Sequence, residues 1–122
     1  MIKLVFCLRR LPPLTLEEFQ RHWHERHAPL VRAHAAALGI RRYVQTHTLE
    51  HPVNAALRAS RGGPDAFDGV AELWWDSAEA LGAASASPEG RAAATELLDD
   101  ERRFIDLAHS PLFVAAERPI DP

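Results

Sequence analysis

The segment FQRHWHERHAPLV, residues 19–31, is the part of the chain richest in side chains that could carry chemistry, because it holds His22, His24 and His27. Imidazole exchanges protons near neutral pH, and its neutral form is the commonest metal ligand in proteins. The segment is therefore a candidate for a metal site or an acid–base site, or it is an amphipathic helix with an unusual composition.

The spacing of these histidines argues against a metal site. At about 100° per residue, His22 and His24 point to nearly opposite sides of a helix and cannot share one ion with His27. The helical zinc pattern, two histidines four residues apart with a glutamate between them, is absent. His24 and His27 could touch, but another ligand would have to come from elsewhere. We expect no metal, and we expect His22 and His24 to face solvent.

His27 is the candidate acid–base residue. Residues at spacings of three and four form one apolar face of a predicted helix. They are Phe19, Trp23, His27, Leu30, Val31, His34 and Leu38. Burial on such a face lowers the pKa of a histidine and keeps the ring neutral, which suits a proton acceptor. The alternative is a structural histidine that bonds a backbone carbonyl freed by Pro29.

Two predicted strands, residues 40–49 and 67–75, carry the other candidates. Alternation along each strand sorts the side chains onto its two sides. The polar and aromatic sets are Tyr43, Gln45 and His47 on the first strand, and Asp68, Glu72 and Trp74 on the second. We expect both sets to share the open face of the sheet and to line a cleft inside a dimer.

His47 and Asp68 are expected to be neighbours on these paired strands. A carboxylate beside an imidazole fixes its tautomer and raises its basicity. A surface ion pair at a strand end is the alternative. Glu72 beside Trp74 could be a carboxylate with a raised pKa, or it could pair with an arginine of a neighbouring strand. Tyr43, Trp74 and Trp75 could stack on a flat ligand, and the alternative, favoured for at least one of the tryptophans, is packing in a dimer interface.

The composition limits the class of protein. A chain of 122 residues, 47% hydrophobic and 25% charged, fits one globular domain spanning residues 1–122. The net charge of −3 argues against nucleic acid or an anionic membrane as partner. No apolar run approaches the roughly 20 residues that span a bilayer. The single Cys7 cannot form an internal disulfide, and we expect a cytoplasmic protein.

The order of the predicted elements defines a fold. Residues 2–9 and 112–119 read as the first and last strands, and helices are predicted from Thr15 to Leu38, at 78–85 and from Pro88 to about residue 106. Pro29 predicts a kink at 27–29, and one helical turn is predicted at 54–58 within the loop 51–65. The resulting βαββαβ order is ferredoxin-like, an α+β fold with an antiparallel four-stranded sheet and helices on one face. Its open face carries apolar residues, which predicts a homodimer.

Two blocks of sequence resemble the EthD domain family of the dimeric α+β barrel superfamily. They are LTLEEFQRHWHERHAPLVRAHAAALGIRRYVQTHTL and FDGVAELWWDSAEAL. The resemblance implies a ferredoxin-like protomer that dimerises into a barrel, with a cleft for a small hydrophobic or aromatic molecule. Superfamily members include polyketide cyclases, muconolactone isomerases and cofactor-free oxygenases. By position, the family pattern falls on His27, His47, Asp68, Glu72 and Trp74.

These observations favour a small cofactor-independent enzyme that cyclises, isomerises, dehydrates or oxygenates a small aromatic, lactone or polyketide-like compound. The expected catalytic residues are His27, as base or acid, and His47 oriented by Asp68. The expected substrate-binding residues are Trp23, Tyr43, Gln45, Glu72 and Trp74. One alternative is a non-catalytic small-molecule-binding accessory protein of an oxidative degradation pathway. Another is a haem protein with His27 or His109 as the axial ligand.

Overall fold

A single antiparallel sheet organises the chain, and the computed structural model describes residues 1–122. The strands are β1 (Ile2–Leu8), β2 (Arg42–His47), β3 (Gly69–Trp75) and β4 (Leu112–Ala115), in the spatial order β2-β3-β1-β4. The helices are α1 (Leu16–His22), α2 (Ala28–Leu38), α3 (Val53–Arg61), α4 (Ala78–Ala86) and α5 (Pro88–Glu101). This is the predicted ferredoxin-like α+β fold.

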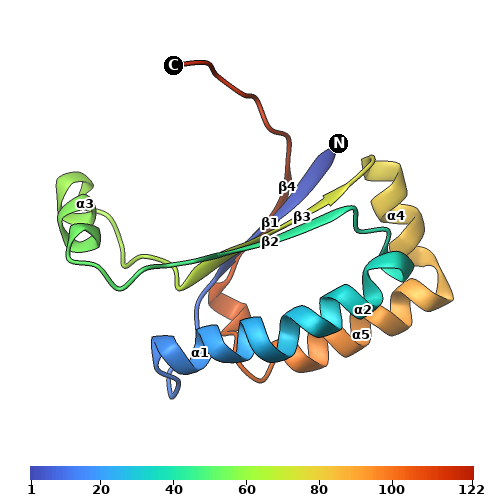
Figure 1. Ribbon diagram of the computed structural model, residues 1–122, viewed down its shortest axis with the longest axis horizontal. Coiled ribbons are helices and arrows are strands. Elements are labelled where there is room, and N and C mark those ends of the chain that lie inside the picture. The colour runs from blue at the N-terminus through green and yellow to red at the C-terminus, as the bar shows by residue number, and fades with distance from the viewer.

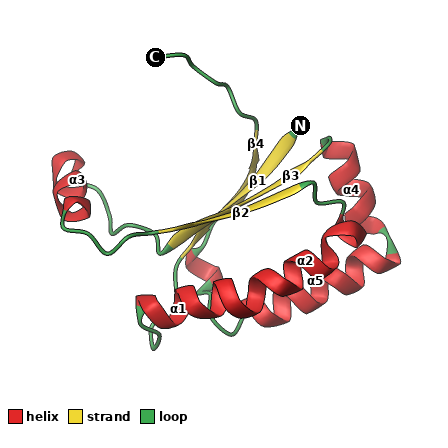
Figure 2. Ribbon diagram, in the orientation of Figure 1, coloured by secondary structure: helices red, strands yellow, loops and turns green.

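The main helices cover only one face of the sheet (Figure 1). α1 and α2 run along that face beside α5, and α4 closes one end, while the other face carries no helix (Figure 2). α3 follows β2 and precedes β3 in the sequence, and it lies beyond the end of the sheet. The core between the layers contains the fully buried side chains Leu8, Phe19, Trp23 and Phe104. No helix is both long and apolar enough to span a bilayer.

Local signals set the ends of the helices as predicted. The Thr15 hydroxyl accepts from the Glu18 backbone N–H, and the Glu18 carboxylate accepts from the Thr15 N–H, which completes the capping box. Gly39 ends α2 at a φ of +72°, a left-handed conformation that glycine adopts without steric cost. Ser77 and Ser87 cap α4 and α5, and Pro88 occupies the first turn of α5.

The predicted interruption of the first helix takes the form of a π-helical turn, η1 (Trp23–His27). Pro29 has no N–H, and its ring would clash with the carbonyl four residues earlier in a regular helix. The wider turn relieves this conflict, and the Ala28 N–H bonds the Trp23 carbonyl five residues back. Trp23 and His27, at the two ends of this turn, are both buried.

Several elements differ in length from their predictions, and β2 and β3 begin two residues later than predicted. β4 ends at Ala115, short of 119, because Ala115 already pairs with Lys3 near the start of β1 and the chain then leaves the sheet (Figure 1). The last helix ends at Glu101, short of 106, and a separate 3-10 turn follows at Leu107–His109. The loop after β2 contains the nine-residue helix α3 where one turn was predicted.

Candidate active site

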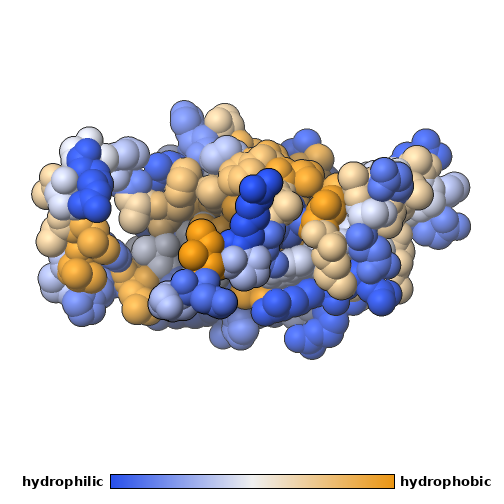
Figure 3. Space-filling model, turned by 90° about the horizontal axis from the view of Figure 1, so that it is seen from above, coloured by the Kyte–Doolittle hydropathy of each residue, from blue (hydrophilic) through white to orange (hydrophobic).

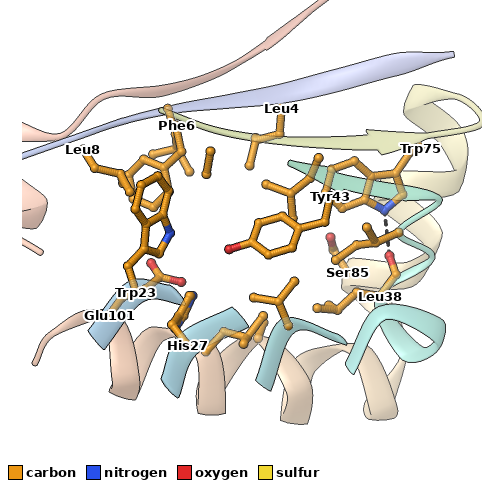
Figure 4. Close-up of a pocket in the computed structure, with 17 residues that line it drawn as sticks. Leu4, Phe6, Leu8, Trp23, His27, Leu38, Tyr43, Trp75, Ser85 and Glu101 are labelled. Atoms are coloured by element: carbon orange, nitrogen blue, oxygen red, sulfur yellow. Dashed lines mark hydrogen bonds between the residues drawn. The ribbon is translucent and has the colours of Figure 1, made fainter. Parts of the chain in front are cut away.

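An apolar cavity of about 320 Å³ lies between the helices and the sheet (Figure 4). Seventeen residues line it, and fourteen of them are hydrophobic. The three others are His27, Ser85 and Glu101. Trp23, His27 and Glu101 stand at one end of the cavity, the Tyr43 hydroxyl points toward that end, and Trp75 stands at the opposite end (Figure 4). The volume falls at the small end of the ~300–1,000 Å³ range of ligand sites.

His27 is held by a buried carboxylate. Its Nδ1 lies 2.8 Å from Oδ2 of Asp100 on α5, and both residues are buried. A carboxylate only accepts hydrogen bonds, so Nδ1 carries the proton and Nε2 of the neutral ring keeps its lone pair. Every fully inaccessible polar side-chain atom has a hydrogen-bond partner. Nε2 makes no hydrogen bond, so it stays accessible, and His27 lines the cavity.

Burial lowers the pKa of His27, and the hydrogen bond and charge of Asp100 only partly oppose this effect. The ring is therefore neutral at neutral pH, the form that accepts a proton. Asp100 also holds His22, whose Nε2 lies 3.1 Å from Oδ1. His22 is thus half-buried on this carboxylate, and the prediction that it faces solvent is wrong. His24 is exposed, as predicted.

No three His, Cys, Asp or Glu side chains come together in a group that could hold a metal ion. His22 and His27 converge through Asp100, while His24 lies on the outer side beside His47. The three histidines of the segment 19–31 thus have three different environments.

Tyr43 supplies a hydroxyl to the same end of the cavity. Its oxygen accepts from the Gln45 amide at 2.7 Å, and Gln45 also donates to the Trp23 carbonyl at 2.9 Å. The tyrosine O–H proton remains free to donate to a ligand. Burial raises the pKa of Tyr43, so the hydroxyl is protonated at neutral pH.

The register of the sheet corrects one prediction. Tyr43, Gln45 and His47 lie opposite Leu73, Ala71 and Gly69, on the face covered by helices. Glu72 and Trp74 lie opposite Val44 and Arg42, on the open face. The two polar sets thus occupy opposite faces of the sheet. Alternation along each strand sorts its side chains correctly into two sets. Which set of β2 shares a face with which set of β3 depends on the register between the two strands.

His47 and Asp68 do not pair. Asp68 precedes β3, and its carboxylate accepts from the Arg10 backbone N–H and guanidinium, both at 2.7 Å. His47 bonds the Gln45 side-chain oxygen at 2.8 Å and stacks on Trp23 with ring centroids 4.4 Å apart. The arginine therefore takes the carboxylate assigned to His47, and His47 lies behind Trp23, outside the cavity lining.

Glu72 and Trp74 are also outside the cavity. Glu72 forms an ion pair with Lys3 rather than with an arginine. The Trp74 indole N–H donates to Glu117 at 3.0 Å, and Lys3 and Arg42 cover its ring. The tryptophan that lines the cavity is Trp75, whose indole N–H donates to the Leu38 carbonyl at 2.7 Å.

Asp100 and Glu101 are the site residues that sequence reasoning missed. They end the segment ELLDDE, which resembles the solvated acidic face of a surface helix. One signal was present, because Ala93, Leu97 and Asp100 follow helical spacing and are all buried. This stripe places the end of α5 against the helix that carries His27.

The absence of a side chain at Gly69 leaves the space that the Trp23 indole occupies. A Cβ atom there would lie 2.3 Å from Cζ3 of Trp23, well inside van der Waals contact. Glycine at the start of β3 thus lets the indole lie directly on the backbone between the sheet and the cavity.

We expect Gly69→Ala to reduce the free energy of unfolding by about 1–3 kcal/mol, because the buried indole must shift in a packed core. Urea denaturation measures this value. Gly82→Ala on α4 is the matched control, since a Cβ there meets nothing within 4 Å and alanine favours the helix. Equal stability of the Gly69→Ala variant and the wild type would contradict the proposed contact.

The arrangement of a four-stranded antiparallel sheet, helices on one face and a cavity between the layers defines a ferredoxin-like α+β protein. Residues 11–108 match the EthD domain family. The chain belongs to this family. Comparison with curated protein sequences finds no significant match.

Solved structures share the fold. An EthD family protein from Bacillus halodurans is 25% identical, with a TM-score of 0.64 over 97% of this chain and 99% of that one. SnoaB, a cofactor-independent oxygenase from Streptomyces nogalater, is 17% identical, with a TM-score of 0.57 over 99% and 96%. A dimeric protein of ferredoxin-like fold from Bacteroides fragilis is 11% identical, with a TM-score of 0.58 over 93% of each chain.

Proposed function

We propose that the chain is a small cofactor-independent enzyme that acts by acid–base chemistry on a small aromatic, lactone or polyketide-like compound. The observation that carries the proposal is His27, held by Asp100 at 2.8 Å, at the wall of an apolar cavity. Cyclisation, isomerisation, dehydration and oxygenation of such compounds can all begin with removal of an acidic C–H or phenolic O–H proton.

The geometry suits this first step. Nε2 of neutral His27 accepts the proton, and the imidazolium that forms is stabilised by the adjacent Asp100 carboxylate. The negative charge that develops on the ligand oxygen needs a donor in the same apolar space. The Tyr43 hydroxyl, positioned by Gln45, provides one. Trp23 and Trp75 bound the cavity at its two ends (Figure 4).

SnoaB, a cofactor-independent oxygenase, shares this fold, and this likeness is consistent with a cofactor-independent reaction in the proposed site. His47, Asp68, Glu72 and Trp74 have no part in the proposed site, because none of them lines the cavity. The proposed catalytic histidine is therefore His27 alone, and Asp100 takes the role first assigned to Asp68.

Tryptophan fluorescence tests ligand binding, because Trp23 and Trp75 both line the cavity. Small aromatic ketones, phenols and lactones that quench the fluorescence are then incubated with wild type and His27→Ala and recovered by chromatography. We expect wild type to convert at least one bound compound and His27→Ala to leave it unchanged. Equal conversion by both proteins would refute His27 as the base.

A non-catalytic binding protein is the second candidate function, and the predominantly apolar lining favours it. Such a protein needs burial of the ligand but no proton acceptor. Recovery of every bound compound unchanged from the wild type would support this function over the enzymatic one.

We also propose a homodimer that covers the open face of the sheet. Apolar side chains gather over this face among charged ones (Figure 3). Phe113, which lies on it beside Val5, is 50% exposed although it sits in a strand. Burial of such surface drives association, and the Bacteroides fragilis protein of the same fold is dimeric.

We expect Phe113→Asp to convert the dimer to a monomer, because it places a charge in an apolar interface. Size-exclusion chromatography with light scattering measures the mass. Ala92→Asp is the control, since Ala92 is exposed on α5, away from the open face. A monomeric wild type, or a Phe113→Asp dimer, would contradict the proposed interface.

A further inference from the structure

Besides Asp100, a second carboxyl group lies near His27, and this one, on Glu101, lines the cavity. Glu101 is the last residue of α5, and it follows Ala94 and Leu97 at helical spacing as a lining residue. Its neighbour Asp100 turns instead toward His22 and His27. The end of one helix thus supplies two carboxyl groups with different surroundings.

Glu101 has no hydrogen-bond or ion-pair partner in the protein. Since every fully inaccessible polar side-chain atom has a partner, the carboxyl oxygens of Glu101 retain accessible surface. An ionised carboxylate in an apolar cavity is costly, whereas the protonated group can act as a donor. Burial and the nearby Asp100 charge raise the pKa of Glu101 to about 7, and the smaller effect of the Arg102 charge opposes this rise.

The acid–base groups of the cavity lie together at one end, whereas Ser85 lies near Trp75 at the other (Figure 4). Figure 4 shows Glu101 beside His27 and Trp23, with the Tyr43 hydroxyl directed toward them. The site therefore combines one proton acceptor, His27, with two donors, Glu101 and the Tyr43 hydroxyl, at the same end of the cavity. Pairing of a base and an acid in this way is suited to a carbonyl group and the C–H beside it.

We propose that Glu101 donates a proton to the carbonyl oxygen of the substrate while His27 removes one from the adjacent carbon. This inference rests on the proposed function and narrows its substrate class to enolisable carbonyl compounds. The C–H bond breaks and its proton moves to Nε2 of His27. The bonding electrons form the enol double bond, and the O–H bond forms with the proton of Glu101. The cavity then holds the enol, an imidazolium and a carboxylate, so charge and protons balance.

Hydrogen–deuterium exchange at the carbon next to the carbonyl of 2-tetralone, followed by NMR in D₂O, tests this step. Binding is verified first by tryptophan fluorescence. We expect wild type to accelerate the exchange and Glu101→Gln to lower the rate about 100-fold at unchanged affinity. Glu89→Gln is the matched control, because Glu89 is exposed on the same helix.

The pH profile separates proton donation from a structural role. The wild-type rate should fall as the pH rises through about 7, where Glu101 loses its proton. Glu101→Gln should lack this alkaline decline, whereas a merely structural change would lower the rate equally at every pH.

The variants also separate this inference from the proposed function. A Glu101→Gln rate and profile equal to wild type, with exchange abolished in His27→Gln, would overturn the role of Glu101 alone. No acceleration by wild type, or equal rates in wild type and His27→Gln, would overturn the proposed function as well.

Discussion

In the Asp100→Asn variant we expect proton abstraction by His27 to slow by about 10²–10⁴-fold. This factor is the usual contribution of a general base, and the variant removes the carboxylate that positions that base. Asp100 contacts His27 at 2.8 Å and is itself buried. An amide offers both a donor and an acceptor, so it no longer forces the proton onto Nδ1 of His27. It also carries no charge to stabilise the imidazolium. Both losses act on the reactive nitrogen.

The exchange rate of 2-tetralone in D₂O measures this effect. Asp99→Asn is the control, because its exposed carboxylate pairs only with Arg102 on the surface of α5. We expect the control to retain the wild-type rate. An Asp100→Asn rate within a factor of three of wild type, in a folded protein, would show that the carboxylate does not govern His27.

Replacing Glu101 by Gln should stabilise the protein at alkaline pH. The pKa of Glu101 is about 7 in the folded protein and 4.5 in an ordinary environment. The folded state thus binds this proton more tightly than the unfolded chain does. The contribution of Glu101 to the free energy of unfolding is fully present below pH 4.5 and is lost as the pH rises through about 7. Above that pH, the loss is on the order of 3 kcal/mol.

Urea denaturation at pH 5 and pH 8.5 measures the difference between Glu101→Gln and wild type. We expect the variant to gain up to about 3 kcal/mol relative to wild type between these pH values. His27 acts in the opposite direction, since its lowered pKa costs stability as the pH falls below 6.5, but this effect is common to both proteins. A difference that does not change with pH would contradict the placement of Glu101 in the cavity. Glu89→Gln should show no such change.

Glu101→Gln is expected to stabilise the protein and to remove a proton donor. This combination is what we expect of a residue that serves function at a cost in stability. Apart from Ser85 and His27, the rest of the cavity lining satisfies the ordinary rule that buried surfaces are apolar. Glu101 breaks the rule, and it does so beside the one histidine that also lines the cavity. A purely structural cavity has no need of either group.

Much of the fold could be predicted because its signals are local. Thr15 and Glu18 mark a helix start, Gly39 marks a helix end, and Pro29 marks an interruption, and each acts through residues within one turn. The burial of His27 also followed from helical spacing. Its partner was not predicted, because a carboxylate was expected beside His47 and only a backbone carbonyl was considered for His27.

The remainder of the site depends on contacts between distant segments. Asp100 reaches His27 across 73 positions of sequence, and which carboxylate of the acidic segment turns inward depends on how α5 is rotated against the first helices. The face occupied by Tyr43 depends on the register of β2 against β3, which alternation alone does not specify. The polar side chains of Tyr43 and Gln45 also suggested a solvent-exposed or open face of the sheet. They lie instead beneath the helices, because a ligand cavity there contains polar groups.

The central claim is that Nε2 of His27 is an unprotonated base facing the cavity at neutral pH. Nitrogen-15 NMR of histidine-labelled protein, with the His27 signals assigned by their loss in His27→Gln, tests it directly. The structure predicts a neutral ring protonated on Nδ1 at pH 7, and an Nε2 signal that shifts when 2-tetralone binds. A ring protonated on Nε2, a charged ring at pH 7, or a signal indifferent to the ligand would contradict the proposed site.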